Sequence, residues 1–205
     1  MLNGKRILLV ISGGIAAYKC LELIRRLRER GAGVTCILTQ GGAQFVTPLS
    51  VAAITEEKVF GDLFSLTDES EMGHIQLSRA ADLLVVAPAS ADIIARMASG
   101  IADDLATTAL LATDKTVLIA PAMNVRMWHH GATQDNLAKL AARGVKQVGP
   151  GEGAMACNEF GLGRMAEPAE ILAAIETIRK GQMYVPQAFA GMIPKNTFHG
   201  LFSHR

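Results

Sequence analysis

Four short apolar segments, separated by stretches with helical spacing, constrain the fold of this chain more than any other feature. Each segment is apolar at nearly every consecutive position and rich in branched residues, without the alternation of a half-exposed strand. Strands of this kind are buried on both faces, which is typical of parallel sheets covered by helices on each side. The segments span residues 6–11, 34–39, 82–89 and 116–120. They predict an α/β fold built on a parallel sheet.

Between and after these strands, apolar residues recur every three or four positions, as in an amphipathic helix. The ligands of such sheets bind beyond the carboxyl ends of the strands, so a site is expected in the loops that follow them. The helical patterns cover 16–31, 90–100, 102–113, 132–144 and 168–181, with shorter ones around 41–46 and from Thr47, and a short strand is expected at 145–149.

The composition is that of one globular domain. The chain has 205 residues, 50% of them hydrophobic and 19% charged, which is long enough to bury a core. Twenty Lys and Arg against 19 Asp and Glu leave a net charge of +1, so the charge does not point to nucleic acid or a membrane as a partner. The three cysteines are odd in number and widely spaced, which favours reduced thiols and a cytoplasmic location.

The two ends of the chain differ from its body. The first 14 residues have a basic start, but their apolar run is too short for a membrane span and lacks a cleavage site, so it predicts a strand and not a signal peptide. Residues 182–205 have no clear period and contain two prolines and four of the ten aromatic residues. We therefore expect a domain of residues 1–181 and an irregular tail of residues 182–205, which either packs loosely or docks on another subunit.

Three of the predicted strands end in loops that suit a phosphate. SGGIAAYK (12–19) offers close backbone approach at Gly13 and Gly14 and a helix N-terminus, although a tight turn explains the glycines equally well. The pattern is neither G-x-G-x-x-G nor a Walker A loop. Thr39 stands where a dinucleotide-binding unit carries an acidic residue. Ser90 suits either a helix cap or a hydrogen-bond donor to an anion. Together these loops predict a phosphorylated mononucleotide as the ligand.

Several reactive side chains lie outside the core pattern. His74 follows a long polar loop at the start of a short helix, and a lone histidine is more often structural than catalytic. The Gly-rich stretch 149–168 reads as a long loop, a kind of segment that is usually functional or disordered, and it contains Cys157 and Arg164. Cys20 and Cys36 fall inside a helix and a strand and are interpreted as small buried hydrophobic residues.

The stretch PAMNVRMW (121–128) directly follows a buried strand and places Asn124 among two methionines and the only tryptophan. With five other segments it resembles the homo-oligomeric flavin-containing cysteine decarboxylases over roughly residues 5–180. The proline, methionines, amide and tryptophan stand at the spacing of that family's P-x-M-N-x-x-M-W signature. The other segments are SGGIAAYK, FVTPLS (45–50), GHIQLSRAADLLVVAPAS (73–90), GIADDLATTALLA (100–112) and ACNEFGLGRM (156–165).

The resemblance implies a flavodoxin-like Rossmann fold with bound FMN and helices on both faces of the sheet. Its best-matching members decarboxylate 4′-phospho-N-pantothenoylcysteine to 4′-phosphopantetheine in coenzyme A biosynthesis, and in many bacteria they form the N-terminal half of a bifunctional protein. In these enzymes the flavin oxidises the substrate to a thioaldehyde, CO2 is lost, and the enethiol is reduced again. The resemblance also implies a homotrimer, or a dodecamer made of trimers.

The resemblance assigns roles residue by residue. His74 matches the active-site histidine, a base or an electrostatic partner, and Asn124 matches the amide that binds the substrate carboxylate. Cys157 matches the cysteine that protonates the enethiol. We expect Met123, Met127 and Trp128 to form an apolar wall around Asn124. The expected FMN contacts are Ser12, Gly13, Gly14, Ile15, Thr39, Ala89 and Ser90; the expected substrate contacts are Asn124, Met127, Ala156 and Arg164; no metal ligand is expected.

Two departures from the family pattern leave alternatives open. Asn158 follows Cys157 where the family commonly has glycine, and nothing after residue 182 resembles the ligase domain of the bifunctional proteins. A peptidyl-cysteine decarboxylase and an inactive flavin-binding regulatory subunit share this fold, although the presence of His74 and Cys157 argues against the second. Flavin prenyltransferases lack the P-x-M-N-x-x-M-W signature, and a plain nucleotide-binding module leaves Asn124 and Cys157 unexplained.

Overall fold

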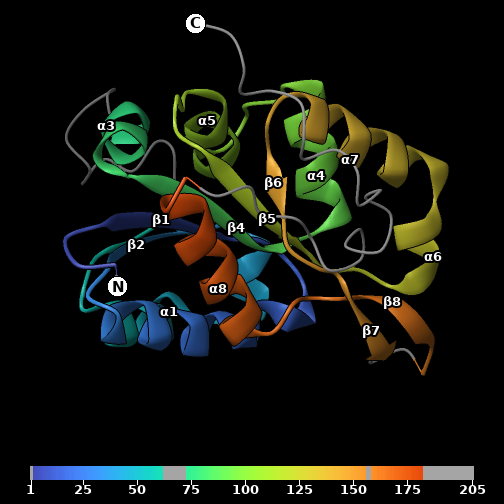
Figure 1. Cartoon of the computed structure of the whole chain (residues 1–205), viewed down its shortest axis with the longest axis horizontal. Helices are drawn as coiled ribbons and strands as arrows, with labels where there is room; N and C mark the ends of the chain where they lie inside the picture. The colour runs from blue at the N-terminus through green and yellow to red at the C-terminus, as the bar shows by residue number, and fades with distance from the viewer. Residues whose placement is uncertain (1, 62–72, 156–157, 182–205) are drawn as a thin grey trace, which may run out of the picture.

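A six-stranded parallel sheet forms the centre of the molecule (Figure 1). The computed structural model describes residues 2–61, 73–155 and 158–181, and for His74 the backbone alone. The strands lie in the order β3-β2-β1-β4-β5-β6, so the chain reverses direction across the sheet between β1 and β4. Their bounds are β1 Arg6–Ile11, β2 Gly33–Leu38, β3 Val59–Phe60, β4 Leu83–Ala89, β5 Val117–Pro121 and β6 Lys146–Gln147.

The predicted parallel sheet is confirmed, and only the edge strand β3 was not expected. β3 pairs with the end of β2. Because β3 has only two residues, it is too short to give a periodic signal in the sequence. Without β3, the order β2-β1-β4-β5-β6 is that of a flavodoxin-like sheet.

Helices cover both faces of the sheet (Figure 1). One face packs against the helices α1, α2 and α8, and the other against α3, α4, α5 and α7. The bounds are α1 Lys19–Glu29, α2 Pro48–Thr55, α3 Gly73–Ala80, α4 Ala91–Ser99, α5 Leu105–Leu111, α7 Gly131–Ala142 and α8 Pro168–Arg179; three short helices are η1 Ile15–Tyr18, η2 Gly42–Gln44 and α6 Val125–His129.

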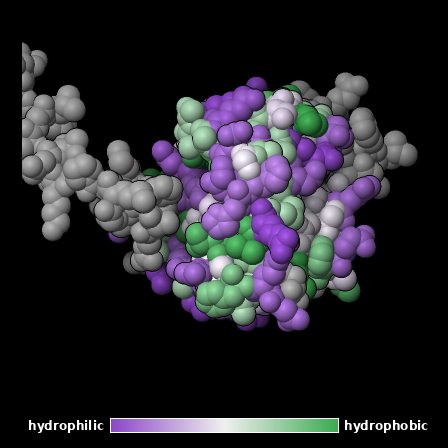
Figure 2. All heavy atoms as spheres, turned by 90° about the vertical axis from the view of Figure 1, so that its right-hand side faces the viewer, coloured by the Kyte–Doolittle hydropathy of each residue, from purple (hydrophilic) through white to green (hydrophobic). Residues whose placement is uncertain are grey.

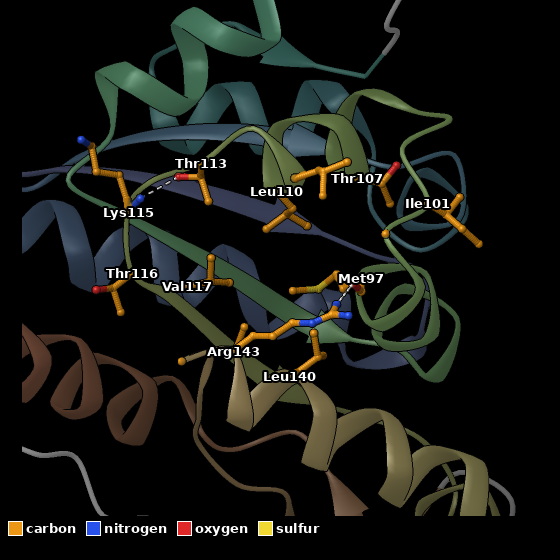
Figure 3. Close-up of a pocket in the computed structure, with 14 residues that line it drawn as sticks. Met97, Ile101, Thr107, Leu110, Thr113, Lys115, Thr116, Val117, Leu140 and Arg143 are labelled. Atoms are coloured by element: carbon orange, nitrogen blue, oxygen red, sulfur yellow. Dashed lines mark hydrogen bonds between the residues drawn. The ribbon is translucent and has the colours of Figure 1, made fainter.

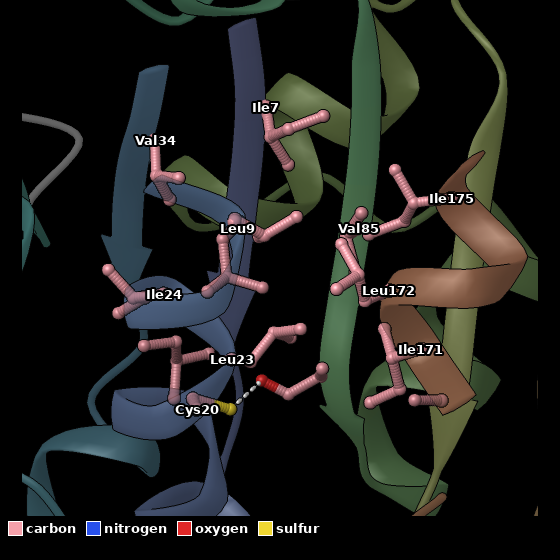
Figure 4. Packing of buried hydrophobic residues seen from close by; sticks show 14 of the residues in the cluster. Ile7, Leu9, Cys20, Leu23, Ile24, Val34, Val85, Ile171, Leu172 and Ile175 are labelled. Carbon is pink, nitrogen blue, oxygen red and sulfur yellow. Dashed lines mark hydrogen bonds between the residues drawn. The ribbon is translucent and has the colours of Figure 1, made fainter. Parts of the chain in front are cut away.

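The core consists of two clusters, one on each face of the sheet. Along β1, Leu9 belongs to the cluster under α1 and α8, and its neighbours Leu8 and Val10 belong to the other. Figure 4 shows the first cluster, in which Leu23 of α1 and Leu172 of α8 lie over the strands. Burial of each such side chain contributes about 1.5–3 kcal/mol. The continuous apolar runs therefore reflect a sheet that is buried on both faces.

The segment predicted as a long Gly-rich loop at 149–168 instead contains an antiparallel hairpin, β7 Gly151–Ala154 and β8 Phe160–Arg164. Glycines alternate along both strands, and alternation is a strand period. On β8 they make room for neighbours: a Cβ at Gly161 would lie 2.8 Å from Val125 Cγ2, and one at Gly163, where φ is +144°, would collide with the Met123 carbonyl oxygen. The hairpin thus lies closely against the start of α6.

The expected tolerance of Asn158 for a turn is confirmed. Asn158 has a φ of 59°, in the left-handed region that glycine favours and asparagine enters more readily than most residues. The predicted tail, residues 182–205, lies outside the described residues. Across the parts of the chain that the structure describes, none of the helices has the length and apolar character needed to cross a membrane.

Candidate active site

Two loops meet where the strand order reverses, and Ser12 joins them. The Ser12 hydroxyl donates to the Pro88 carbonyl oxygen at 2.5 Å and accepts from the Ser90 backbone N–H at 3.2 Å. Ser90 in turn caps α4, because its Oγ accepts from the N–H of Ile93 at 3.3 Å. Among the described residues, the Ser90 hydroxyl proton has no acceptor. The ends of β1 and β4 are therefore fixed, and one donor remains beside the N-terminus of α4.

The loops after β1 and β2 approach each other through glycines. A Cβ at Gly13 would lie 3.1 Å from the Gly41 Cα, so larger residues would push the two loops apart. Thr39 organises the second loop, because its Oγ1 accepts from the Gly42 N–H at 3.0 Å and donates to the Ile11 carbonyl oxygen at 3.3 Å. Gly14 has a φ of 155°. A Cβ added to it would have only one neighbour within 4 Å, the Pro88 side chain at 4.0 Å. The backbone at Gly14 is thus accessible to a ligand.

A pocket of about 370 Å³ opens beyond the carboxyl ends of β1 and β5. Its volume falls in the usual range of small-molecule sites. Its walls come from η1 and the start of α1, from the turn after β5, and from the hairpin; the lining residues are Gly14, Ile15, Ala16, Tyr18, Lys19, Ala122, Met123, Asn124, Ala154, Met155, Gly163, Arg164 and Met165. On the side of the molecule that carries α6, α7 and β8, hydrophobic residues gather in patches between hydrophilic ones (Figure 2).

Asn124 is fixed at the pocket wall by its role in the backbone. It caps α6, and its Oδ1 accepts from the Met127 N–H at 2.8 Å. The backbone is held from the other side, because the Met123 N–H donates to the Gly163 carbonyl oxygen at 3.0 Å. With the oxygen of the amide engaged, the NH2 group is the part of the amide that remains available as a donor. A neutral amide donor suits a carboxylate.

Two cations line the same pocket and share one carboxylate. The Lys19 ammonium is nearly buried, with a side-chain exposure of 10%, and it donates to the Glu167 carboxylate at 2.6 Å and to the Met165 carbonyl oxygen at 3.3 Å. The Arg164 guanidinium lies 3.6 Å from the same carboxylate oxygen. Two positive charges against one negative charge leave this wall of the pocket cationic.

The structure brings part of the predicted site together in the pocket. Gly14, Ile15, Asn124 and Arg164 line it. The other predicted FMN contacts lie at the carboxyl ends of the strands but outside the lining, at the end of β4 and in the loops after β1, β2 and β4; they are Ser12, Gly13, Thr39, Ala89 and Ser90. Ligand contacts at all of these positions stay predictions.

The predicted apolar wall around Asn124 is only partly present. Met123 lines the pocket, whereas Trp128 packs against the second core cluster and Met127 is 47% exposed on α6. The short helix explains the difference, because it turns the chain away from the pocket after Asn124. Of the other predicted residues, His74 lies in the first turn of α3, its side chain outside the described residues; Ala156 and Cys157 lie outside them altogether.

Sequence reasoning missed Lys19. The residue lies inside the predicted first helix, and the sequence pattern assigned it no role. The sign of a buried lysine was its position on the helix: Lys19 falls on the buried face of α1, together with Cys20, Leu23, Ile24 and Leu27. A lysine on an apolar stripe needs a buried partner, and here that partner lies 148 positions further along the chain.

A second cavity, of about 230 Å³, lies at the amino ends of the strands, between α4, α5 and α7 (Figure 3). Two of its polar side chains bind the protein itself. The Arg143 guanidinium donates to the carbonyl oxygens of Met97 and Ala98 and so closes the C-terminus of α4, and Thr113 Oγ1 accepts from the Lys115 N–H. Lys115, which also lines the cavity, pairs with the Asp114 carboxylate at 2.8 Å.

The two described cysteines are structural, as predicted. Both are buried and free, and the Cys20 thiol donates to the Ala87 carbonyl oxygen at 2.8 Å. Burial raises the pKa of Cys36 to about 12 and that of Cys20 well above its usual range. Neither thiol is therefore ionised near neutral pH.

Comparison with known proteins defines the class to which this fold and site belong. The family model described as Flavoprotein matches residues 1–180. Because this match covers far more than half of the chain, the chain belongs to the flavoprotein family.

Among its relatives is the coenzyme A biosynthesis bifunctional protein CoaBC. The chain is 50% identical to that protein from Vibrio vulnificus (strain YJ016) over 175 residues, which are 85% of this chain and 44% of the relative. It is 49% identical to the one from Escherichia coli (strain K12) over 171 residues, 83% of this chain and 42% of the relative. The chain thus spans less than half the length of these curated relatives.

Two solved structures match nearly from end to end. A mutant PPC decarboxylase complexed with pantothenoylaminoethenethiol aligns with a TM-score of 0.77 and 32% identity, covering 86% of this chain and 98% of that one. The FMN binding protein AtHal3 aligns with a TM-score of 0.74 and 32% identity, covering 88% and 99%. The predicted flavodoxin-like α/β fold is thereby confirmed.

Proposed function

We propose that this chain binds FMN and decarboxylates 4′-phospho-N-pantothenoylcysteine to 4′-phosphopantetheine in coenzyme A biosynthesis. The observation that carries the proposal is the Asn124 amide, whose oxygen is held by the Met127 N–H so that its NH2 group serves a ligand in the pocket. The substrate carries a carboxylate and a phosphate. The pocket offers an amide donor for the first and the cations Lys19 and Arg164 for the second.

The strand-end loops fit a flavin mononucleotide. Gly13 and Gly41 bring two loops together, Gly14 leaves its Cβ side open, and Ser90 keeps a hydroxyl proton for a phosphate oxygen at the N-terminus of α4. Thr39, at the end of β2, supplies no carboxylate for the ribose of a dinucleotide. We assign the phosphate of FMN to Ser90 and to the loops after β1 and β2. Ser12 holds Ser90 in place.

Bound FMN supplies the electron acceptor and donor that no protein side chain provides, which makes the carbon beside the carboxylate able to release CO2. The residues of this chain bind and orient the substrate. Asn124 holds the carboxylate without a full positive charge, so its loss as CO2 does not break an ion pair. Met123, beside it, lowers the polarity of the site, which favours the loss of charge.

Two further roles rest on the resemblance alone. We assign His74 to the oxidative step, as a base or electrostatic partner, and Cys157 to the final protonation of the enethiol. The variant Cys157→Ser is expected to lose CO2 and to release a product lighter than 4′-phosphopantetheine by two hydrogens. High-resolution mass spectrometry of the product checks this, and normal 4′-phosphopantetheine from the variant would contradict the role of Cys157.

We further propose that the chain assembles as a homotrimer or a dodecamer of trimers in the cytoplasm. Large apolar side chains are exposed close to the proposed flavin site: Ile15 and Tyr18 on η1, and Phe45 and Leu49 beside and on α2. Exposed apolar groups of this kind favour a subunit contact. The described cysteines are free, which agrees with a reducing compartment. Light scattering of the purified protein tests the assembly.

The test of the function is incubation with 4′-phospho-N-pantothenoylcysteine. Purified protein is heated to release its cofactor, which chromatography identifies, and the reaction is followed by mass spectrometry. We expect FMN, and a product that has lost the mass of CO2. FMN without conversion of this substrate, but with conversion of a peptide that ends in cysteine, would favour a peptidyl-cysteine decarboxylase. FMN with neither conversion would favour a regulatory subunit.

A further inference from the structure

Glu167 stands outside the pocket lining but contacts both cations that form its charged wall. Its carboxylate oxygen Oε1 lies 2.6 Å from the Lys19 ammonium and 3.6 Å from the Arg164 guanidinium. The two cations come from α1 and from the end of β8, far apart in sequence, and both line the pocket. A single carboxylate therefore joins the two walls.

The need for such a carboxylate follows from the burial of Lys19. A nearly buried ammonium requires hydrogen-bond acceptors, because it has lost its water, and an opposite charge beside it stabilises it further. In the structure it finds the Met165 carbonyl oxygen and Glu167. An anionic ligand in the pocket would present a third acceptor to the same donors, and it would stand close to the negative charge of Glu167.

We propose that Glu167 is a positioning residue that acts through Lys19 and Arg164: it holds both cations at the pocket wall and weakens the binding of a phosphate there, so that a phosphorylated product can leave. The proposal rests on the proposed function, in which substrate and product carry the same phosphate. Because both carry it, tight binding of that group would lower KM but slow product release. A fixed carboxylate beside the cations limits that binding through like-charge repulsion.

The variant Glu167→Gln separates charge from geometry. Glutamine keeps an oxygen that accepts from the Lys19 ammonium, and the cap of α8 persists because the backbone N–H of residue 167 donates to Glu170. Only the negative charge is lost. The variant should therefore fold and hold the cations, while removing the repulsion of the phosphate.

The experiment measures kcat and KM with 4′-phospho-N-pantothenoylcysteine and with the same compound lacking its phosphate. For Glu167→Gln we expect KM of the phosphorylated substrate to fall about tenfold and kcat to fall severalfold, with both constants for the unphosphorylated substrate within about twofold of the wild type. The exposed Glu152 of β7 gives a matched control, and Glu152→Gln should behave as the wild type with both substrates. Equal changes with both substrates, no change, or a higher KM for the phosphorylated one would overturn the proposal.

A binding measurement keeps the test independent of turnover. Isothermal titration of the FMN-loaded protein with inorganic phosphate should give about tenfold tighter binding to Glu167→Gln than to the wild type, and wild-type affinity for Glu167→Asp, which keeps the charge. Equal affinity in wild type and Glu167→Gln would contradict the role of Glu167. If neither substrate is converted by the wild type, the proposed function fails, and the titration still decides the role of Glu167.

Discussion

The pocket beyond the carboxyl ends of the strands and the cavity at their amino ends are both lined by apolar and cationic side chains, yet they differ in what their polar groups do. In the first, Asn124 lines the pocket with its oxygen engaged by the Met127 N–H, and Lys19 and Arg164 outnumber the one carboxylate that they share. In the second, Arg143 is used to close the end of α4. A cavity alone therefore does not identify a site, whereas donors that the fold leaves unused do.

Replacement of Asn124 tests this difference most severely. Aspartate is as good a helix cap as asparagine, so Asn124→Asp should fold and retain FMN. Its carboxylate would repel that of the substrate, and we expect turnover to fall by about a thousandfold or more. The control is Arg143→Gln in the other cavity, with turnover within about twofold of the wild type. Full activity of Asn124→Asp, measured by CO2 release, would remove this residue from the mechanism.

Gly163→Ala tests whether the hairpin must lie against the turn after β5. The added Cβ would collide with the Met123 carbonyl oxygen, at a φ that disfavours alanine. We expect a loss of about 2–4 kcal/mol in the free energy of unfolding and a turnover about a hundredfold lower. Gly131→Ala is the matched control, because nothing lies within 4 Å of its Cβ position at the start of α7. Denaturation and kinetics that are alike in the two variants would contradict the close contact.

Ser90→Ala addresses the flavin loops. The change removes the cap of α4 and the hydroxyl donor, and we expect a loss of about 1 kcal/mol in stability and an FMN affinity about tenfold weaker. Flavin fluorescence measures the affinity. The matched variant Asp104→Ala removes the cap of α5, outside the loops after β1, β2 and β4, and should cost similar stability with unchanged FMN binding. Unchanged FMN binding in Ser90→Ala would leave this residue a cap and no more.

Leu110→Ala, in the amino-end cavity, is expected to have the smallest effect on activity. The side chain is buried in the second core cluster, so its truncation should cost about 2–3 kcal/mol of stability. Turnover per folded molecule should stay within about twofold of the wild type. A large loss of turnover at a temperature where the variant is fully folded would show that the amino-end cavity takes part in function.

The sequence predicts a structural feature well where one local pattern of side chains corresponds to one backbone element. The apolar runs predicted the main strands, and the motif around Asn124 predicted a residue that the structure places in the pocket. The hairpin was missed because glycine lowers strand propensity, and its alternation was the only sign of a strand. Lys19 and Glu167 were missed as a pair because their contact depends on how α1 and α8 pack together, which no local pattern records.

The measurement that tests the central claim most directly is a crystal structure of the FMN-loaded protein with 4′-phosphopantetheine. We predict that the product lies in the pocket beyond β1 and β5, with its thiol end near Asn124 and its phosphate against Lys19 and Arg164. Product bound instead in the cavity beside Arg143 and Lys115, or bound with its phosphate remote from Lys19, would contradict the account.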